Sequence, residues 1–594
     1  MRKPARAKTV SRRATIQKTT LGTKAAVLFA ALCFWNWAVP AVAQDWPQDA
    51  HDAQRTGATA EEPVEPWTFL WSFNGPDAQG GIGNHFFDAP REARTVMGPD
   101  AIFIPGGAQG LYAIGKTNGA QLWNLRVASF NATPAYDSSG FVFAGGSNGT
   151  LYKINATSGV VSGTYAAGSG LNKSVLLTAS SIYVVSDDGR LHNVNKSTMT
   201  ASWVYAGGAG AATPASYSPS RNILVYATDD LFVHAVNNSD GSRKWRVKPS
   251  PNSPGDPSVT VTQTVSGTSV GSQFDLGWPV IAEQHGVVLL RMQLPHDFMA
   301  AYPSTGGIFP NVLATTRSWL QANPQNKNLF VLNLDDGTEK FVPAVGYGST
   351  EDTISTRTAG YGVMGSQPVV KVWPGGQEVA YIHFRNGQSS PPDYRWDGHM
   401  GEMVLDSTTI AGLAPGDLRF VKMTRDQGSV GYVRIIDEQN PITIAGSSLF
   451  HSHWAAVESV KITDRSATLG LAYATPINTS KHPVMMRSLK NCTNQNNATH
   501  WTTCTNLSYV TDGGRFYDGP GWWGYWNVAD PPGWRVGSGN TAGTQYSAGF
   551  QPRYTYVGSG YIVIQDNGGA VYVFRHSGST ASPPAAPTGL RIVP

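Results

Sequence analysis

The feature that most constrains the fold is a short motif that returns along the chain at a nearly fixed interval. Its first copy is the stretch 111–123, LYAIGKTNGAQLW, which reads as an apolar strand, a glycine turn and a second strand with a closing tryptophan. Leu111, Leu151 and Leu191 begin three copies spaced 40 residues apart, and related copies begin at Val233 and Leu329. A period of about 40 to 45 residues with several short strands per unit is typical of a β-propeller blade.

The repeat therefore predicts an all-β fold that forms a single β-propeller. With 65 glycines and 38 prolines but only 14% charged residues, the chain is rich in turns and poor in solvated helix. Eight blades are favoured, because apolar strands recur at positions 111, 151, 191, 233, 329, 403, 460 and 571. Seven is the alternative, since the strands at 403 and 460 rest on apolar runs alone.

The two ends of the chain predict how the ring closes. The last blade runs through Val571 to Phe574 and then lacks a closing tryptophan strand, whereas residues 67–73, WTFLWSF, form a strand without a blade of its own. We expect residues 67–73 to be the outer strand of the last blade. Closure of this kind removes the exposed edges of an open sheet.

The first 43 residues have the character of a secretory signal. A basic stretch precedes the apolar run 25–43, which ends in Ala41-Val42-Ala43, so we expect cleavage after Ala43 and a secreted or periplasmic protein with no stable membrane span. An uncleaved membrane anchor is the alternative. The expected organisation is a signal peptide, an N-terminal extension, a propeller with three insertions and a Pro/Ala-rich tail. Their ranges are 1–43, 44–66, 67–577 with insertions near 248–328, 384–402 and 480–550, and 578–594.

Charge and cysteine content restrict the partners and the covalent links. The eight basic residues of the signal account for the formal charge of +4, so the mature chain is near −4 and carries no electrostatic footprint for nucleic acid. Of the three cysteines, Cys492 and Cys504 remain after cleavage. In an exported chain we expect these two to form a disulfide, with metal binding as the weaker alternative.

The order of strand, Gly-rich turn, L-Y-A-I, polar pair, Gly and Trp resembles the pyrroloquinoline-quinone-type repeat propellers. That family spans quinoprotein alcohol dehydrogenases and a non-enzymatic propeller of the outer-membrane assembly machinery. The resemblance implies that glycines and tryptophans of the repeat dock one blade on the next, and that Tyr165 and Phe341 stand where a Trp is expected. The positions in question are Gly119, Trp123, Gly159, Trp203, Gly241, Trp245 and Gly337.

The same resemblance raises the question of a cofactor. Quinoprotein dehydrogenases hold a quinone and calcium in the central funnel beside an Asp base, against a pair of adjacent cysteines. This chain has neither adjacent cysteines nor a C-x-x-C-H haem motif. Its matching segments carry the docking repeat rather than the family's site, so pyrroloquinoline quinone is not favoured as a cofactor.

Aromatic residues gather in the stretch 513–554. Flat aromatic rings on a Gly-rich loop are suitable platforms for sugar rings. The candidate ligand-binding residues are Trp522, Trp523, Tyr525, Trp526 and Trp534. Packing of an irregular blade interface explains the same cluster, because large aromatics are more often core than site.

A histidine pair is the other candidate centre. His451 and His453 would share one face of a strand, since side chains alternate along it. With His399 they could hold a divalent metal, and with Tyr394 and Arg395 they could supply the base and the charge neutralisation of a polysaccharide lyase. Ordinary packing histidines are the competing interpretation.

These patterns favour an exported propeller that acts as a binding or scaffolding module for a protein or a polysaccharide. The alternative is an extracellular enzyme that degrades polysaccharide, and a quinone-dependent dehydrogenase ranks below it. A scaffold requires only a shaped surface. A lyase requires converging His, Tyr and Arg side chains, and a quinoprotein requires a calcium-binding cavity on the axis.

Overall fold

The structure is a computed structural model that divides into two compact units, Met1–Ala41 and Val42–Pro594. The residues it describes all lie in the second unit. They are 45–64, 67–73, 90, 93–254, 272–274, 277–294, 313–345, 367–384, 399–409, 412–421, 441–453, 456–464, 478–481, 484–487, 507–510, 552–566 and 571–577. No helix in these ranges is long and apolar enough to span a bilayer.

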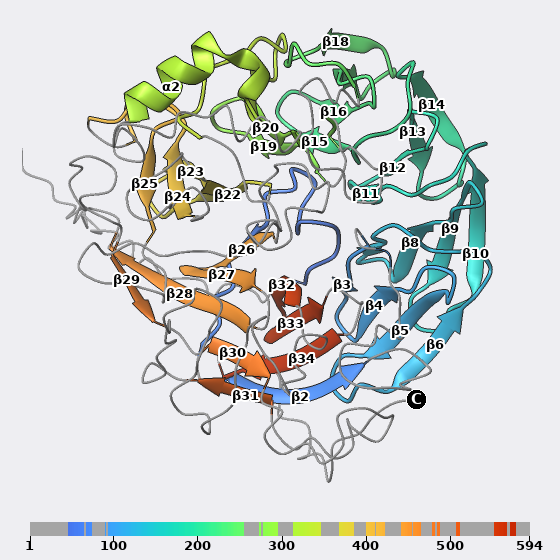
Figure 1. The fold of residues 1–594 in the computed structure, drawn as a ribbon. Helices are drawn as coiled ribbons and strands as arrows, with labels where there is room; N and C mark the ends of the chain where they lie inside the picture. Colours follow the sequence, from blue (N-terminus) through green and yellow to red (C-terminus); the bar gives the residue numbers. More distant parts are fainter. Residues whose placement is uncertain are drawn as a thin grey trace, which may run out of the picture. The chain divides into compact units, whose positions relative to one another are not determined.

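Eight small sheets, which we call blades 1 to 8, make up the second unit (Figure 1). Blades 1 to 4 have four antiparallel strands each, which run in sequence order from the inside outward. Blade 1 is β3 (Val96–Met97), β4 (Ala101–Pro105), β5 (Leu111–Gly115) and β6 (Gln121–Leu125). Blade 2 is β7 (Ala135–Asp137), β8 (Phe141–Gly145), β9 (Thr150–Asn155) and β10 (Val161–Ala166). Blade 3 is β11 (Leu176–Leu177), β12 (Ser181–Val185), β13 (Arg190–Asn195) and β14 (Ala201–Ala206). Blade 4 is β15 (Ser216–Ser218), β16 (Ile223–Ala227), β17 (Val233–Asn237) and β18 (Arg243–Val247).

Blades 5 to 8 are less regular. Blade 5 has β19 (Val280–Ala282), β20 (Val287–Arg291) and β21 (Leu329–Asn333), with helices α2 (Leu313–Ala322) and η1 (Pro324–Asn326) before β21. Blade 6 is β22 (Val369–Val372), β23 (Glu378–Phe384), β24 (His399–Val404) and β25 (Leu418–Phe420). Blade 7 has β26 (Ile442–Ala445), β27 (Ser448–His453) and β28 (Ala456–Asp464), extended by β29 (Asn478–Lys481), β30 (Val484–Arg487) and β31 (Leu507–Val510). Blade 8 is β32 (Pro552–Gly558), β33 (Tyr561–Asp566), β34 (Val571–His576) and β2 (Trp67–Phe73).

The eight-bladed ring and its closure by the N-terminal strand are confirmed. Each of the eight positions counted in the sequence falls in the third strand of its blade. Strand β2 pairs antiparallel with β34, with Trp71 opposite Val573, and completes blade 8. The apolar cores lie between neighbouring blades: one cluster joins Val142 of blade 2 to Ala113 of blade 1, and another joins Leu224 of blade 4 to Leu191 of blade 3. A blade is therefore buried only when its neighbours are present.

Tryptophan on glycine is the joint at four junctions between blades. At the junction of blades 8 and 1, a Cβ on Gly119 would lie 2.8 Å from the ring of Trp71, and the Trp71 indole N–H donates to the Lys116 carbonyl at 2.9 Å. Gly119 has φ of 69°, so the turn needs glycine for its backbone as well as for the space. The other three joints pair Trp123 with Gly159, Trp203 with Gly241 and Trp245 with Gly337.

The junction of blades 2 and 3 has no tryptophan on glycine, and the prediction that Tyr165 takes the tryptophan position is wrong. In blade 1, Trp123 of β6 lies opposite Ala113 of β5. The equivalent residue of blade 2 is Gly163 of β10, which lies opposite Lys153 of β9. The Met199 side chain fills the gap, since a Cβ on Gly163 would lie 2.9 Å from its Cγ. The Lys153 ammonium donates to the Lys196 carbonyl at 3.0 Å, which replaces the missing indole N–H. At this junction the large side chain, Met199, comes from blade 3 and the small residue, Gly163, from the outer strand of blade 2, which is the reverse of the four tryptophan joints.

Phe341 takes the tryptophan's role between blades 5 and 6. Its ring lies 3.0 Å from the position of a Cβ on Gly416, a glycine with φ of 84°. This outcome agrees with the sequence pattern. The joint keeps the flat ring on a glycine but has no indole N–H to donate.

Candidate functional site

Residues 45–62 run along the inner edges of the blades, where Figure 1 draws them in blue. We call this stretch the axial segment. Its carbonyl oxygens accept hydrogen bonds of 2.7 to 3.2 Å from backbone N–H groups of blades 1, 2, 4, 5, 6 and 7. The pairs, N–H first, are Met97–Trp46, Tyr136–Pro47, Tyr217–Ala53, Ile281–Gln54, Val370–Thr56 and Ile444–Gly57.

The remaining blades are reached by side chains, and blade 7 gains a short strand as well. For blade 3, the Leu177 N–H donates to Gln48 Oε1 at 2.9 Å, and for blade 8 the Gly560 N–H donates to Glu61 Oε1 at 2.6 Å. Strand β1 (Ala58–Thr59) pairs in parallel with β26 and adds an inner strand to blade 7. The axial segment therefore contacts all eight blades in their order along the chain.

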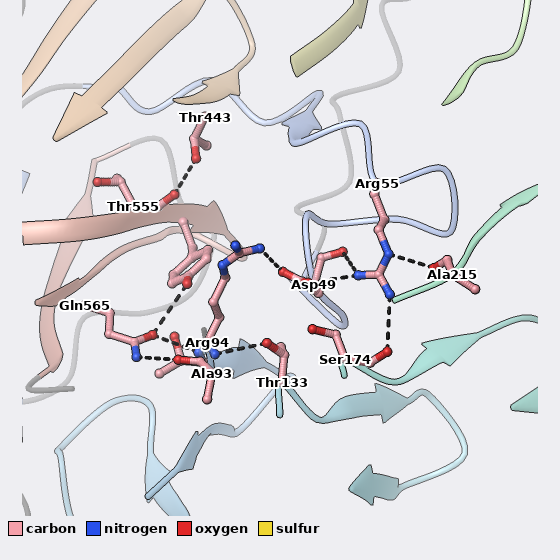
Figure 2. A network of polar contacts seen from close by, with 12 residues as sticks. Asp49, Arg55, Ala93, Arg94, Thr133, Ser174, Ala215, Thr443, Thr555 and Gln565 are labelled. Atoms are coloured by element: carbon pink, nitrogen blue, oxygen red, sulfur yellow. Dashed lines mark hydrogen bonds and ion pairs between the residues drawn. The ribbon is translucent and has the colours of Figure 1, made fainter. Parts of the chain in front are cut away.

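A buried ion triad anchors this segment (Figure 2). The carboxylate of Asp49 lies between the guanidinium groups of Arg55, at 2.9 Å, and Arg94 of blade 1. Arg55 also donates from Nε to the carbonyl of Ala215, just before β15 of blade 4, at 2.8 Å. The side chains of the triad are at most 7% exposed. Removing one member of such a buried pair typically costs about 3 to 5 kcal/mol, because its partner remains charged in a dry site.

The protonation of the triad follows from its packing. Burial would raise the pKa of Asp49, but the two guanidinium groups outweigh it and the pKa of Asp49 is lowered. Burial lowers the pKa of Arg55 to about 10, although Asp49 acts in the opposite direction. Arg94 also stacks on the ring of Trp278 at 3.9 Å and on that of Tyr554 at 4.5 Å. All three groups are charged at neutral pH, so Asp49 is a structural anion and not a proton donor or acceptor.

The axial residues do not fit a stacked quinone with calcium. The edges of the first strands, which face the axis, are hydrogen-bonded to the axial segment. The carboxylate at its centre, Asp49, is already paired with two guanidinium groups and cannot serve as a calcium ligand without leaving them buried and unpaired. We derive no chemistry through that cofactor.

The outer strands of blades 1 to 3 form a second feature, which we call the uncharged rim. It consists of β6, β10 and β14, and none of these strands contains Asp, Glu, Lys or Arg. Leu122 is 49% exposed, Val160 beside β10 is 62% exposed and Val204 is 45% exposed. In the described part of the chain, no strand pairs with their outer edges. By contrast, the outer strand of blade 4 reads RKWRV and is strongly basic.

Of the predicted histidine centre, the structure describes the side chain of His451 alone. His451 is 1% exposed in β27, and its ring lies edge-on to that of His383 in β23, with centroids 4.3 Å apart. His399 and His453 belong to strands β24 and β27 of blades 6 and 7. Among the described residues there is no group of three or more His, Cys, Asp or Glu arranged to hold a metal. The metal and lyase assignments stay predictions.

The other predicted site residues lie outside the described ranges. These are Tyr394, Arg395, the five aromatic residues Trp522, Trp523, Tyr525, Trp526 and Trp534, and the two cysteines Cys492 and Cys504. The aromatic binding surface and the disulfide therefore remain predictions from the sequence.

Two histidines that the sequence reasoning did not single out form matching networks in blades 3 and 4. His192 bonds Tyr165 OH at 2.9 Å and Ser186 Oγ at 3.0 Å, while His234 bonds Tyr205 OH and Thr228 Oγ1, both at 3.0 Å. Burial lowers the pKa of each histidine to about 4, so both are neutral at pH 7. Their repetition in consecutive third strands was visible in the sequence and indicates a packing role.

Comparisons with known proteins agree with the repeat. Residues 107–276 match the family described as outer membrane protein assembly factor BamB, which confirms the resemblance to the quinone-type repeat propellers over this part of the chain. No match was found among curated proteins.

Three solved structures are among those similar to this chain. BamB from Moraxella catarrhalis has 10% identity and a TM-score of 0.41, covering 86% of this chain and 100% of that one. The quinohemoprotein alcohol dehydrogenase ADHIIG from Pseudomonas putida HK5 has 11% identity and a TM-score of 0.43, covering 91% and 82%. The designed protein Ika8 has 8% identity and a TM-score of 0.40, covering 86% and 99%.

Proposed function

We propose that this β-propeller, whose first blades carry the quinone-type repeat, is an exported scaffold that binds a protein partner along its uncharged rim. The observation that carries the proposal is the exposed, charge-free character of β6, β10 and β14. An edge strand presents unpaired N–H and C=O groups, and soluble proteins usually protect such edges with charged residues or proline. Three neighbouring blades here lack that protection.

The chemistry of the rim favours an extended polypeptide over other partners. Added strands gain affinity from backbone hydrogen bonds and specificity from alternate side chains. On β10, exposed Ser162, Thr164 and Ala166 alternate with half-buried residues, so one row of small side chains faces outward. The partner expected is a protein with an exposed strand that pairs with one of these edges and carries apolar residues beside Val160 or Val204.

Two further observations support a binding role. The inner edges of the blades are occupied by the chain's own axial segment, so the outer surfaces are left for partners. The matching family is described as an outer membrane protein assembly factor, and we extend a role in assembly to this chain. The aromatic residues of the polysaccharide-binding alternative, and Tyr394 and Arg395 of the lyase alternative, lie outside the described ranges, and no described contact favours either alternative.

Site-specific photo-cross-linking in the native host tests the proposal. A photo-reactive residue in place of Thr164 on β10 or Val204 on β14 should capture the same protein. The matched control is Lys244 on β18, which is exposed on the outer strand of the basic blade 4 and should capture none of it.

A second test places a lysine on the rim. Thr164→Lys or Val204→Lys should weaken binding of the captured protein roughly tenfold, equivalent to about 1.4 kcal/mol, while the thermal unfolding of the scaffold is unchanged. Capture that is equal from all three positions, or binding that is insensitive to the lysines, would show that the rim is not the docking surface.

A further inference from the structure

We infer that the inner edges of the blades form a binding site for a polypeptide segment that contains turns, and that the axial segment is its resident ligand. The same segment supplied by another molecule should be able to take its place. This inference concerns the axis and is independent of the binding proposed for the rim.

The first support is the kind of contact that the ring makes with the segment. In six blades, a backbone N–H of the first strand or its flank donates to a backbone carbonyl of the segment. The first strand of each blade is the inner edge of its sheet, so these N–H groups would have no sheet partner without the segment. The ring therefore presents backbone donors to the axis, and the turns of the segment bring one carbonyl after another to successive blades.

The second support is a set of side-chain anchors that fix which peptide fits. Trp46 is buried against the ring of Tyr556, with centroids 5.4 Å apart. Gln48 accepts from Leu177 of blade 3, and Asp49 pairs with Arg94 of blade 1. Arg55, six residues after Asp49, donates to Ala215. The recognised pattern is thus Trp-Pro-Gln-Asp followed by an arginine, with backbone contacts supplying the rest.

The third support is the manner in which the segment leaves the axis. Glu61 accepts from His576 at 2.7 Å, and the Val64 carbonyl accepts from the Ser577 N–H at 2.9 Å, so the contacts with the ring continue to residue 64. The Val64 side chain is exposed, and the next described residue is Trp67 of β2. A cut after Val64 therefore leaves residues 45–64 and their contacts with the ring on one piece and β2 on the other.

The experiment uses the full chain with a site-specific protease sequence inserted between Val64 and Trp67. After cleavage, the piece that ends at the insertion should stay with the ring through gel filtration. A fluorescent synthetic peptide of residues 45–64, added in excess, should then replace it, as measured by fluorescence anisotropy. If cleavage loosens the ring, the same peptide should restore its original thermal unfolding transition.

Variant peptides show whether recognition depends on the anchors. The Asp49→Asn peptide should bind at least about 100-fold more weakly, because it leaves Arg94 buried without its carboxylate. The Asp52→Asn peptide is the matched control, since the Asp52 carboxylate contacts Thr56 and His51 within the segment. It should bind within about threefold of the parent peptide, as expected for a contact that does not involve the ring.

Three results would overturn the inference. The cut piece could leave a ring that keeps its original unfolding transition, the ring could unfold without rescue by any peptide, or the Asp49→Asn peptide could bind as tightly as its control.

Discussion

Exchanging Gly163 for tryptophan and Met199 for glycine should convert the junction of blades 2 and 3 into the tryptophan joint found at four other junctions. Met199 is 7% exposed and has φ of 54°. Met199→Gly alone removes buried contacts worth about 2 to 5 kcal/mol and relieves a left-handed backbone worth about 1 to 2 kcal/mol. The single variant should therefore lose about 1 to 3 kcal/mol.

The second single variant and the double variant complete the cycle. Gly163→Trp alone forces an indole into the space of the Met199 side chain and should cost about 1 to 3 kcal/mol or more. In the double variant the ring lies over glycine, and its N–H can reach the Lys196 carbonyl that Lys153 now occupies. We expect the double variant to be within about 1 kcal/mol of the parent, which corresponds to an interaction energy of about 1 to 6 kcal/mol.

Urea unfolding of the purified proteins measures the effect, with an unchanged m-value as the condition for comparing midpoints. The control is Tyr165→Trp combined with Met199→Gly, since Tyr165 lies two residues beyond the joint and its hydroxyl bonds His192. Its two costs should add. If the Gly163 and Met199 costs also add, or if the Tyr165 variant shows the coupling instead, the register between β9 and β10 is refuted.

Two further predictions concern the junctions between blades. His285 of blade 5 bonds Glu378 at 2.7 Å and Asp406 at 2.8 Å in blade 6, and these bonds, led by that to Glu378, raise the pKa of His285 despite burial. Its contribution should be complete below the unfolded pKa of about 6.5 and lost as the pH rises through the folded value, so thermal stability should fall over that range and His285→Gln should remove the slope. Trp71→Phe keeps an aromatic ring but loses the hydrogen bond to the Lys116 carbonyl, so the urea midpoint should fall by an amount equivalent to about 1 kcal/mol. A loss as large as that of Trp71→Ala would show that ring packing does not supply most of the stability of the joint.

The sequence was sufficient for the ring because each blade repeats the same local chemistry. A glycine turn and an apolar third strand can be counted along the chain. Residues 67–73 read as a strand with no neighbouring strands of its own blade, which predicted that they complete the last blade. The prediction for Tyr165 was wrong because the chain has an aromatic residue near the position of the joint but not at it. Only the pairing of Gly163 with Lys153 shows which residue occupies that position.

The axial segment could not be predicted in the same way. Most of its contacts are made by backbone carbonyls of residues such as Pro47, Ala53 and Gly57. Every residue type has a backbone carbonyl, so the sequence does not show which of them accept hydrogen bonds. Its partners lie between residues 94 and 576, so no local spacing connects them. Asp49 and Arg55 stand six residues apart in a polar stretch, where the sequence offers no sign that both are buried.

The position of strand β2 has a consequence for the order in which the protein can be made. Its partner β34 is the last strand described, so β2, which is made early, must wait for nearly the whole chain before it can pair. Contacts of such sequence separation are slow to form and leave edges exposed meanwhile. A product that stops before residue 571 has no partner for β2, so its ring cannot close. Chains that stop before β34 therefore keep an open sheet edge and are open to proteolysis.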